Sequence, residues 1–214
     1  MSTPLVVIGA GGFGRETLDV VDAVNRAAGE PVFDLLGVVD DDPSLNNAAR
    51  LNSRGIRYLG RSSEWLAGGN RAQYLIGIGS PTLRQRVDEE FRTAGLTGAI
   101  VVHPAATVGS MVSIGEGSII CGGAQISTNV SIGRHVHVNP NATVGHDSLL
   151  NDFVSINPAA TISGEVRVGT RTVIGAGAVV LQGLDLAENV LVGACACVTK
   201  NVPAGVTVMG VPAR

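Results

Sequence analysis

The chain has 214 residues, of which 15 are Lys or Arg and 18 are Asp or Glu, giving a formal net charge of -3. This mildly acidic balance, without a long basic run, argues against nucleic acid or an anionic membrane as the main partner. Neither a secretory leader nor an apolar stretch long enough to span a bilayer is recognisable, so we expect a cytoplasmic location and no membrane partner.

The first hundred residues are predicted to alternate strands with helices. We expect a buried strand at 5–8, a helix after a glycine-rich turn, a second strand at 33–39, a third at 74–78 and a helix at 81–94. Strands that alternate with helices in this way are typical of a parallel sheet. Residues 1–100 are therefore predicted to form an α/β, Rossmann-like domain.

A glycine-rich turn follows the first strand, and three aspartates follow the second. The turn, GAGGFG, contains Gly9, Gly11, Gly12 and Gly14. Such glycines let backbone amides and a helix N-terminus approach a phosphate, and Asp40 or Asp41 at the end of the next strand can hold a ribose hydroxyl. A redox dinucleotide, a nucleotide or nucleotide sugar, and a purely structural turn with Asp40 as a strand-end residue all remain open. The absence of a second mononucleotide-binding half disfavours the dinucleotide.

The second half of the chain has an uninterrupted period of six. Every sixth residue from Val102 to Val198 is aliphatic, and small or medium residues such as Ala124, Ala142 and Ala160 lie two positions before them. Both members of each pair should point inward from a short strand. This regularity excludes a sandwich, whose strands vary in length, and predicts a parallel β-solenoid over residues 101–214. A coil of eighteen residues brings residues eighteen apart into one vertical stack, with about five coils in the run.

Gly or Asn directly follows ten of these aliphatic residues. Both types tolerate a positive φ, so we expect the tight corner of each strand-corner-strand unit at this position. The ten positions are Gly109, Gly115, Gly133, Asn139, Gly145, Asn151, Asn157, Gly169, Gly175 and Gly193.

The complete chain resembles the hexapeptide-repeat sugar acetyltransferases of the sialic-acid O-acetyltransferase and bacillosamine N-acetyltransferase type. The resemblance rests on GAGGFGRE, DDDP, GIGS, the hexapeptides with NATVGHD, and the closing NVPAGVTVMGVPAR. It implies a left-handed β-helix, although the general rule for parallel crossovers favours a right-handed path. It also implies a nucleotide-linked sugar held by the α/β domain, acetyl-CoA lying along the solenoid as cosubstrate, and a homotrimer with active sites between neighbouring chains.

His146 is the candidate general base, because acyl transfer to an amine or alcohol needs a group that accepts a proton near neutral pH. It follows Gly145 and should project outward, next to Asp147. The family motif is acidic-His-acidic; Gly145 replaces its first member, while His146 and Asp147 keep the pair that the resemblance implies to be catalytic. Asp147 is expected to orient the imidazole. A plain surface histidine is the alternative.

Three further positions are implied by the resemblance. Gly164, eighteen residues after His146, matches the backbone amide that stabilises the oxyanion, and Asn139 matches an asparagine near the substrate, or is simply a corner residue. Ser155 stands where many relatives have a second active-site histidine for acetyl-CoA. His137, one coil earlier, is either a replacement for that imidazole or a surface residue.

The remaining histidines and the cysteines are assigned no chemistry. We expect His103 at the junction of the domains and His135 on a solvated face, and reduced structural thiols at Cys121, Cys195 and Cys197, which lack CxxC spacing. No metal is expected.

The sequence therefore predicts an acetyl-CoA-dependent N-acetyltransferase acting by direct attack on a nucleotide-linked amino sugar. Three alternatives are a sugar O-acetyltransferase, a γ-type carbonic anhydrase, for which the histidines lack the family's zinc pattern, and a non-enzymatic scaffold or nucleotide sensor.

Overall fold

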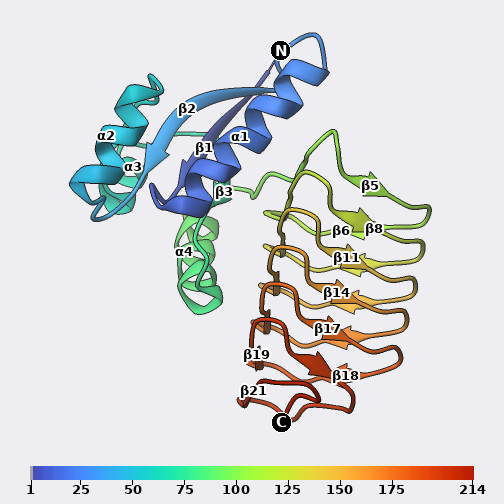
Figure 1. The fold of residues 1–214 in the computed structure, drawn as a ribbon. Helices are drawn as coiled ribbons and strands as arrows, with labels where there is room; N and C mark the ends of the chain where they lie inside the picture. Colours follow the sequence, from blue (N-terminus) through green and yellow to red (C-terminus); the bar gives the residue numbers. More distant parts are fainter. Residues whose placement is uncertain (1) are drawn as a thin grey trace. The chain divides into compact units, whose positions relative to one another are not determined.

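A computed structural model describes residues 2–214 and shows two compact units (Figure 1), with the boundary between Val101 and Val102. The first unit contains β1 (Thr3–Ile8), α1 (Gly12–Ala27), β2 (Phe33–Val39), α2 (Leu45–Ser53), α3 (Ser62–Ala67), β3 (Gln73–Ile76) and α4 (Pro81–Thr93). Its strands form a parallel sheet in the order β2-β1-β3. The predicted α/β class is confirmed, and the short helices α2 and α3 are additions that the sequence pattern did not reveal.

The helices of the first unit begin at local signals in the sequence. The hydroxyl of Ser44 accepts the Asn47 N–H at the start of α2, and Ser80 accepts the Leu83 N–H at the start of α4, where Pro81 is the first residue. Behind the sheet, Trp65 and Phe91 stack with ring centroids 5.8 Å apart. These aromatic rings contribute much of the buried surface in the core of the first unit.

The second unit is a left-handed parallel β-helix with three sides, each a ladder of two-residue strands. The first side consists of β4 (Val101–Val102), β7 (Ile119–Ile120), β10 (His137–Val138), β13 (Ser155–Ile156), β16 (Val173–Ile174), β19 (Leu191–Val192) and β21 (Thr207–Val208). The second side consists of β5 (Thr107–Val108), β8 (Gln125–Ile126), β11 (Thr143–Val144), β14 (Thr161–Ile162), β17 (Val179–Val180) and β20 (Cys197–Val198). The third side consists of β6 (Ser113–Ile114), β9 (Ser131–Ile132), β12 (Leu149–Leu150), β15 (Arg167–Val168) and β18 (Asp185–Leu186).

The eighteen-residue register predicted from the sequence is confirmed. Val144 of β11 pairs with Ile126 in one neighbouring coil and with Ile162 in the other. The aliphatic and alanine columns fill the interior, where Ala142, Val144 and Ala160 have no exposed surface. In the last coil, β21 pairs with β19 through Thr207 and Leu191, sixteen residues apart, so the register is shortened by two at the C-terminal end.

The corners differ from the sequence-based expectation. The prediction of a positive φ directly after the aliphatic residue was wrong at all ten positions. The positive φ occurs two residues after that position, as at Asn129 (57°), Asp147 (60°) and Glu165 (61°). Glycine is needed directly after the aliphatic residue because a Cβ there would collide with the backbone of the next coil. A Cβ on Gly169 would lie 2.4 Å from the carbonyl carbon of Ala187 in the next coil. The stacked backbones therefore approach too closely for a side chain there.

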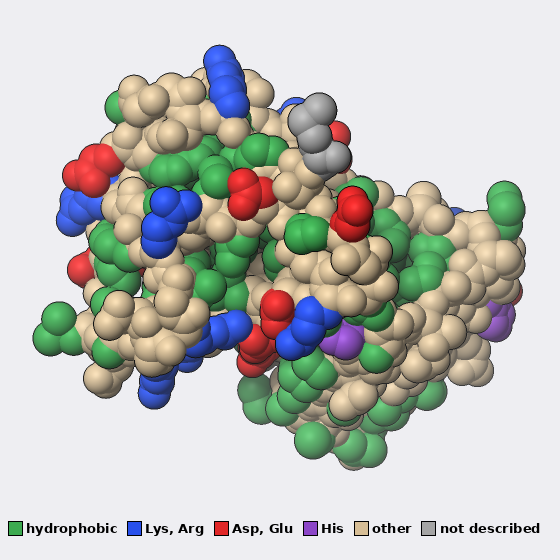
Figure 2. Space-filling model, turned by 90° about the horizontal axis from the view of Figure 1, so that it is seen from above, with side chains coloured by type: hydrophobic (Ala, Val, Ile, Leu, Met, Phe, Trp, Pro, Cys, Tyr) green, Lys and Arg blue, Asp and Glu red, His purple; other side chains and the backbone are tan. Residues whose placement is uncertain are grey.

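Figure 2 shows side chains of Lys or Arg and of Asp or Glu scattered among one another over part of the face in view. None of the helices among the described residues is long and apolar enough to cross a membrane.

We predict that Gly169→Ala destabilises the solenoid more than Gly183→Ala does. The first change forces two coils apart and should cost about 1–3 kcal/mol, as overpacking does. Gly183 has a φ of 69°, but a Cβ there would meet no atom within 4 Å, so alanine costs only the left-handed backbone penalty of about 1–2 kcal/mol, and Ala159 already adopts that conformation. Thermal unfolding of both variants measures the difference. A larger loss for Gly183→Ala would contradict the spacing explanation.

Candidate active site

The glycine-rich turn between β1 and α1 opens onto a cavity of about 340 Å³ in the first unit. Gly11 and Gly12 line it at the N-terminus of α1, where backbone N–H groups are not used by the helix. A Cβ on either of these glycines would meet no protein atom within 4 Å. The fold itself does not require glycine at these two positions, and the open space suits a ligand that approaches the backbone closely.

Gly9 and Gly14 have a different explanation. Gly9 adopts a φ of 104°, and a Cβ on Gly14 would lie 1.8 Å from the carbonyl oxygen of Gly9. These two residues allow the sharp turn and the close packing of α1 against β1. Of the four glycines that the sequence grouped together, Gly9, Gly11 and Gly12 line the cavity and Gly14 does not.

Asp40 and Asp41, at the end of β2, also line the cavity. Oδ2 of Asp40 accepts the Ala10 N–H at 2.7 Å, and its Oδ1 accepts the Asp42 N–H at 2.9 Å. Asp41 accepts the Ser62 N–H at 2.8 Å. Both carboxylates thus hold the surrounding loops, and each oxygen keeps a lone pair for a further donor.

Arg84 of α4 fixes the other wall of this cavity, the segment that contains Gly77, Ile78 and Gly79. Its Nη1 donates to the carbonyls of Ile78 at 2.9 Å and Gly79 at 3.3 Å. Burial lowers the pKa of Arg84 to about 9, so the side chain remains protonated at neutral pH. The charge therefore stays available to these carbonyl partners.

In the second unit, His146 lies at the corner that joins β11 to β12, with 56% of its side chain exposed. Its Nδ1 is 2.7 Å from Oδ2 of Asp147. An ionised carboxylate only accepts hydrogen bonds, so Nδ1 carries the proton and Nε2 of the neutral ring is left as the base. The pairing that sequence adjacency alone did not guarantee is thus present.

Asn129 lies one coil before Asp147 and completes this arrangement. Its Nδ2 donates to Oδ1 of Asp147 at 3.0 Å. The hydrogen bond from His146, followed by that from Asn129, holds the pKa of Asp147 below its ordinary value, because both stabilise the ionised carboxylate. Asn129 was not predicted from the sequence, although its spacing of eighteen residues from Asp147 indicates that the two residues stack in adjacent coils.

Gly164 lies beside the imidazole, one coil after His146. A Cβ on Gly164 would be 2.6 Å from Nε2 of His146, so any other residue would collide with the ring. Among residues 2–214, no hydrogen-bond partner accepts the Gly164 N–H. The equivalent corner position elsewhere holds Pro140 and Pro158, which have no N–H to satisfy. The coil therefore leaves this amide available to a ligand.

The structure does not bring Asn139, Ser155 or His137 to the His146 corner of the same chain. Ser155 and His137 pair with each other on the first side of the solenoid. Asn139, at the corner between β10 and β11, donates through Nδ2 to the Ile156 carbonyl at 2.9 Å, and its φ is not positive. The side-chain amide of Asn139 is therefore used inside the coil.

Two histidine expectations were wrong. His135 was expected on a solvated face and His137 was considered as a surface residue, but each is only 1% exposed. His135 stacks on Phe153 one coil later, with ring centroids 5.5 Å apart. His103 has a local contact, accepting the Ala105 N–H through Nδ1 at 3.0 Å.

His146 also lines a groove of about 610 Å³ along the second side of the solenoid, with Thr128, Thr143 and Gln125. A second cavity, of about 400 Å³, lies at the C-terminal end and is lined by Lys200 and Arg214. Within residues 2–214, no three His, Cys, Asp or Glu side chains are arranged to hold a metal ion.

Comparison with known proteins agrees with this description. Residues 4–91 match the family model of the PglD N-terminal domain. The acetyltransferase domain of PglB from Neisseria gonorrhoeae FA1090, solved with acetyl coenzyme A, is 30% identical with a TM-score of 0.85, covering 100% of this chain and 99% of that chain.

PerB from Caulobacter crescentus, solved with CoA and GDP-perosamine, is 30% identical with a TM-score of 0.86, covering 99% of this chain and 96% of that chain. WeeI from Acinetobacter baumannii AYE is 27% identical with a TM-score of 0.82, covering 99% of both chains. No curated protein sequence matches the chain. The identity and coverage of these relatives show that the chain belongs to the hexapeptide-repeat nucleotide-amino-sugar N-acetyltransferase family.

Proposed function

We propose that the protein transfers the acetyl group of acetyl-CoA to the amino group of a nucleotide-linked amino sugar. The observation that carries this proposal is the arrangement at His146, whose Nδ1 is held by Asp147 while its ring lies against Gly164, a residue whose N–H has no partner among the described residues. A base and an oxyanion donor side by side suit acyl transfer. The relatives solved with acetyl coenzyme A, or with CoA and GDP-perosamine, support the choice of both substrates.

The reaction proceeds by direct attack. Nε2 of His146 takes a proton from the sugar amine as its nitrogen bonds to the thioester carbonyl carbon. The Gly164 N–H donates to the oxyanion of the tetrahedral intermediate, and Asp147 stabilises the imidazolium. When the C–S bond breaks, the imidazolium returns the proton to the departing CoA sulfur, which leaves the amide product and the free thiol.

The two units hold different reactants. Residues 1–100 bind the nucleotide, with its phosphates at the N-terminus of α1 beside Gly11 and Gly12 and its ribose near Asp40 and Asp41. Residues 101–214 bind acetyl-CoA and carry the chemistry. Two observations support this division. The backbone of Gly11 and Gly12 is accessible in the cavity of the first unit, and His146 lies in the second unit.

Acetyl-CoA extends from His146 toward the C-terminal end of the solenoid. Lys200, the single lysine of the chain, is fifty-four residues after His146, which corresponds to three coils or about 14 Å along the axis. Together with Arg214 it lines the C-terminal cavity. Two cations at this distance suit the phosphate groups at the far end of CoA.

The active unit is a homotrimer with sites between neighbouring chains. His146 is more than half exposed, and Asn139 and Ser155 lie away from its corner in the same chain. A neighbouring chain would exclude water from the imidazole and bring a second set of side chains to it. Ser155, Asn139 and His137 are buried within one chain, at 4%, 7% and 1% exposure, so we assign them no contact across the interface.

Replacing the base tests the catalytic assignment. His146→Ala should lower kcat by about 10² to 10⁴, the size expected for loss of a positioned base, while acetyl-CoA affinity stays unchanged. Asp147→Asn should cost less, because the imidazole itself remains. Steady-state kinetics and calorimetry with acetyl-CoA measure the two effects. Full turnover by His146→Ala would exclude it as the base.

The nucleotide site is tested by Gly11→Val. The valine side chain would enter open cavity rather than protein, so we expect weaker binding of the nucleotide sugar without a change in melting temperature or acetyl-CoA affinity. Calorimetry with the nucleotide sugar and with acetyl-CoA measures the two affinities separately. A variant that mainly loses acetyl-CoA binding would overturn the assignment of ligands to units.

The trimer is tested by light scattering. We expect a mass three times that of the chain at working concentration, because a site with an exposed base needs a second wall. A monomer that retains full activity would contradict the shared site.

Mass spectrometry of reactions with acetyl-CoA tests the acceptor class. Nucleotide-linked sugars that carry an amine should gain an acetyl group, and matched sugars with a hydroxyl at the same carbon should not. Acetylation of a free or hydroxyl-bearing sugar alone would identify an O-acetyltransferase instead.

A further inference from the structure

The geometry points to Asn129 as a positioning residue for the catalytic histidine, acting through Asp147 from the preceding coil. This inference rests on the proposed function, because it assumes that His146 is the general base. The side-chain amide of Asn129 has no hydrogen bond to the imidazole and donates instead to the carboxylate that does. No other described side chain supplies a hydrogen bond to Oδ1 of Asp147.

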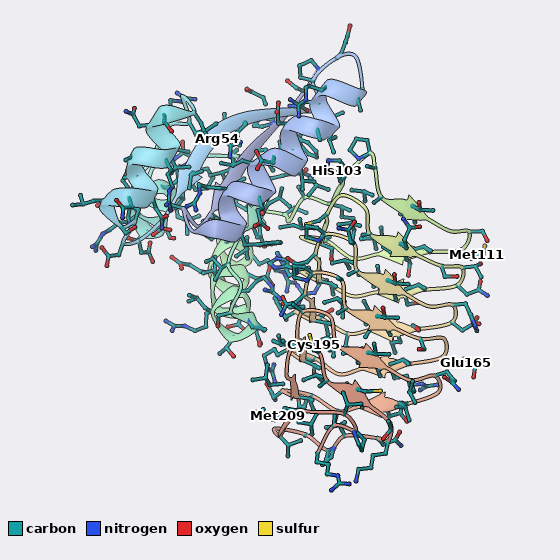
Figure 3. The ribbon with its side chains drawn as sticks, in the orientation of Figure 1. Arg54, His103, Met111, Glu165, Cys195 and Met209 are labelled. Carbon is teal, nitrogen blue, oxygen red and sulfur yellow. The ribbon has the colours of Figure 1, made fainter. Side chains whose placement is uncertain are left out.

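The three side chains form one chain of hydrogen bonds across two coils. Nδ2 of Asn129 is 3.0 Å from Oδ1 of Asp147, and Oδ2 of Asp147 is 2.7 Å from Nδ1 of His146. With one donor on each oxygen, the carboxylate plane cannot rotate without breaking a bond. Figure 3 shows Met111 and Glu165, which bracket Asn129 and Asp147 in this eighteen-residue column, along one edge of the solenoid.

Fixing the carboxylate matters because Asp147 is itself exposed. Its side chain is 46% exposed, so solvent competes for both oxygens. A free carboxylate samples orientations in which neither oxygen faces Nδ1. The Asn129 amide restricts that freedom and thereby keeps the Nδ1–H tautomer, with Nε2 directed at the reacting amine.

The backbone conformation alone could also account for an asparagine at position 129, and a glycine substitution distinguishes this explanation from the positioning role. Asn129 has a φ of 57°, a conformation that asparagine tolerates well. Glycine tolerates it equally and occupies the same corner position at Gly117 and Gly183. Asn129→Gly therefore preserves the backbone and removes only the amide. Asn141, with a φ of 58° and no side-chain hydrogen bond among the described residues, gives the matched control Asn141→Gly.

We expect Asn129→Gly to lower kcat about tenfold with little change in KM for either substrate, the size of one hydrogen bond to a charged group. Asn141→Gly should behave as the parent protein, and both variants should keep the parent melting temperature. In the His146→Ala background, Asn129→Gly should cause no further loss, because its effect passes through the imidazole. Losses that add, or equal kinetics for the two glycine variants, would overturn the inference.

Carboxyl NMR provides a readout that does not depend on turnover. The pKa of Asp147 should rise in Asn129→Gly and stay unchanged in Asn141→Gly, because only the first change removes a donor to its carboxylate. An unchanged pKa in Asn129→Gly would show that the hydrogen bond is not formed in solution. If the parent protein acetylated no amino sugar, the proposed function would fail, and the NMR comparison would still decide whether Asn129 orders Asp147.

Discussion

The hydrogen-bond ladder between successive coils is the constraint on which the rest of the solenoid depends. Each two-residue strand pairs with strands eighteen residues before and after it, as Val144 does with Ile126 and Ile162. The ladder fixes the coil spacing at about 4.8 Å, which brings outward side chains into vertical columns and leaves no room for a Cβ where the backbones are closest. Asn129 with Asp147, and His146 with Gly164, are neighbours for this reason alone.

The fold was largely predictable because it follows from periodicity. The period of six predicted the strands, the inward aliphatic columns and the eighteen-residue register, and alternating strands and helices predicted the first unit. The corner geometry was not predictable from residue preferences, since glycine has two uses that look alike in a sequence. At Gly169 it avoids the next coil, whereas the positive φ is two residues further along, where Ala159 and Glu165 also adopt it. Handedness came from family resemblance.

The candidate site was predictable in part. Residue chemistry and resemblance selected His146, Asp147 and Gly164, and the register explains their contacts. Burial was harder to predict, because an outward strand position such as His137 or a corner position such as His135 can still be covered, and both residues were considered as surface residues. Asn129 was missed because its role appears only when adjacent coils are considered together. The different roles of the turn glycines were likewise not visible in the sequence: Gly11 faces open space, whereas Gly14 packs against Gly9.

The central claim is that coil stacking fixes the His146 imidazole with Nδ1–H bonded to Asp147 and Nε2 free to accept a proton. Nitrogen-15 NMR of the neutral His146 ring tests it most directly, because the two ring nitrogens have distinct chemical shifts that report which of them is protonated. The account predicts the Nδ1–H tautomer as the dominant form in the resting protein. A dominant Nε2–H tautomer, or a rapidly averaging ring with equal populations, would contradict it.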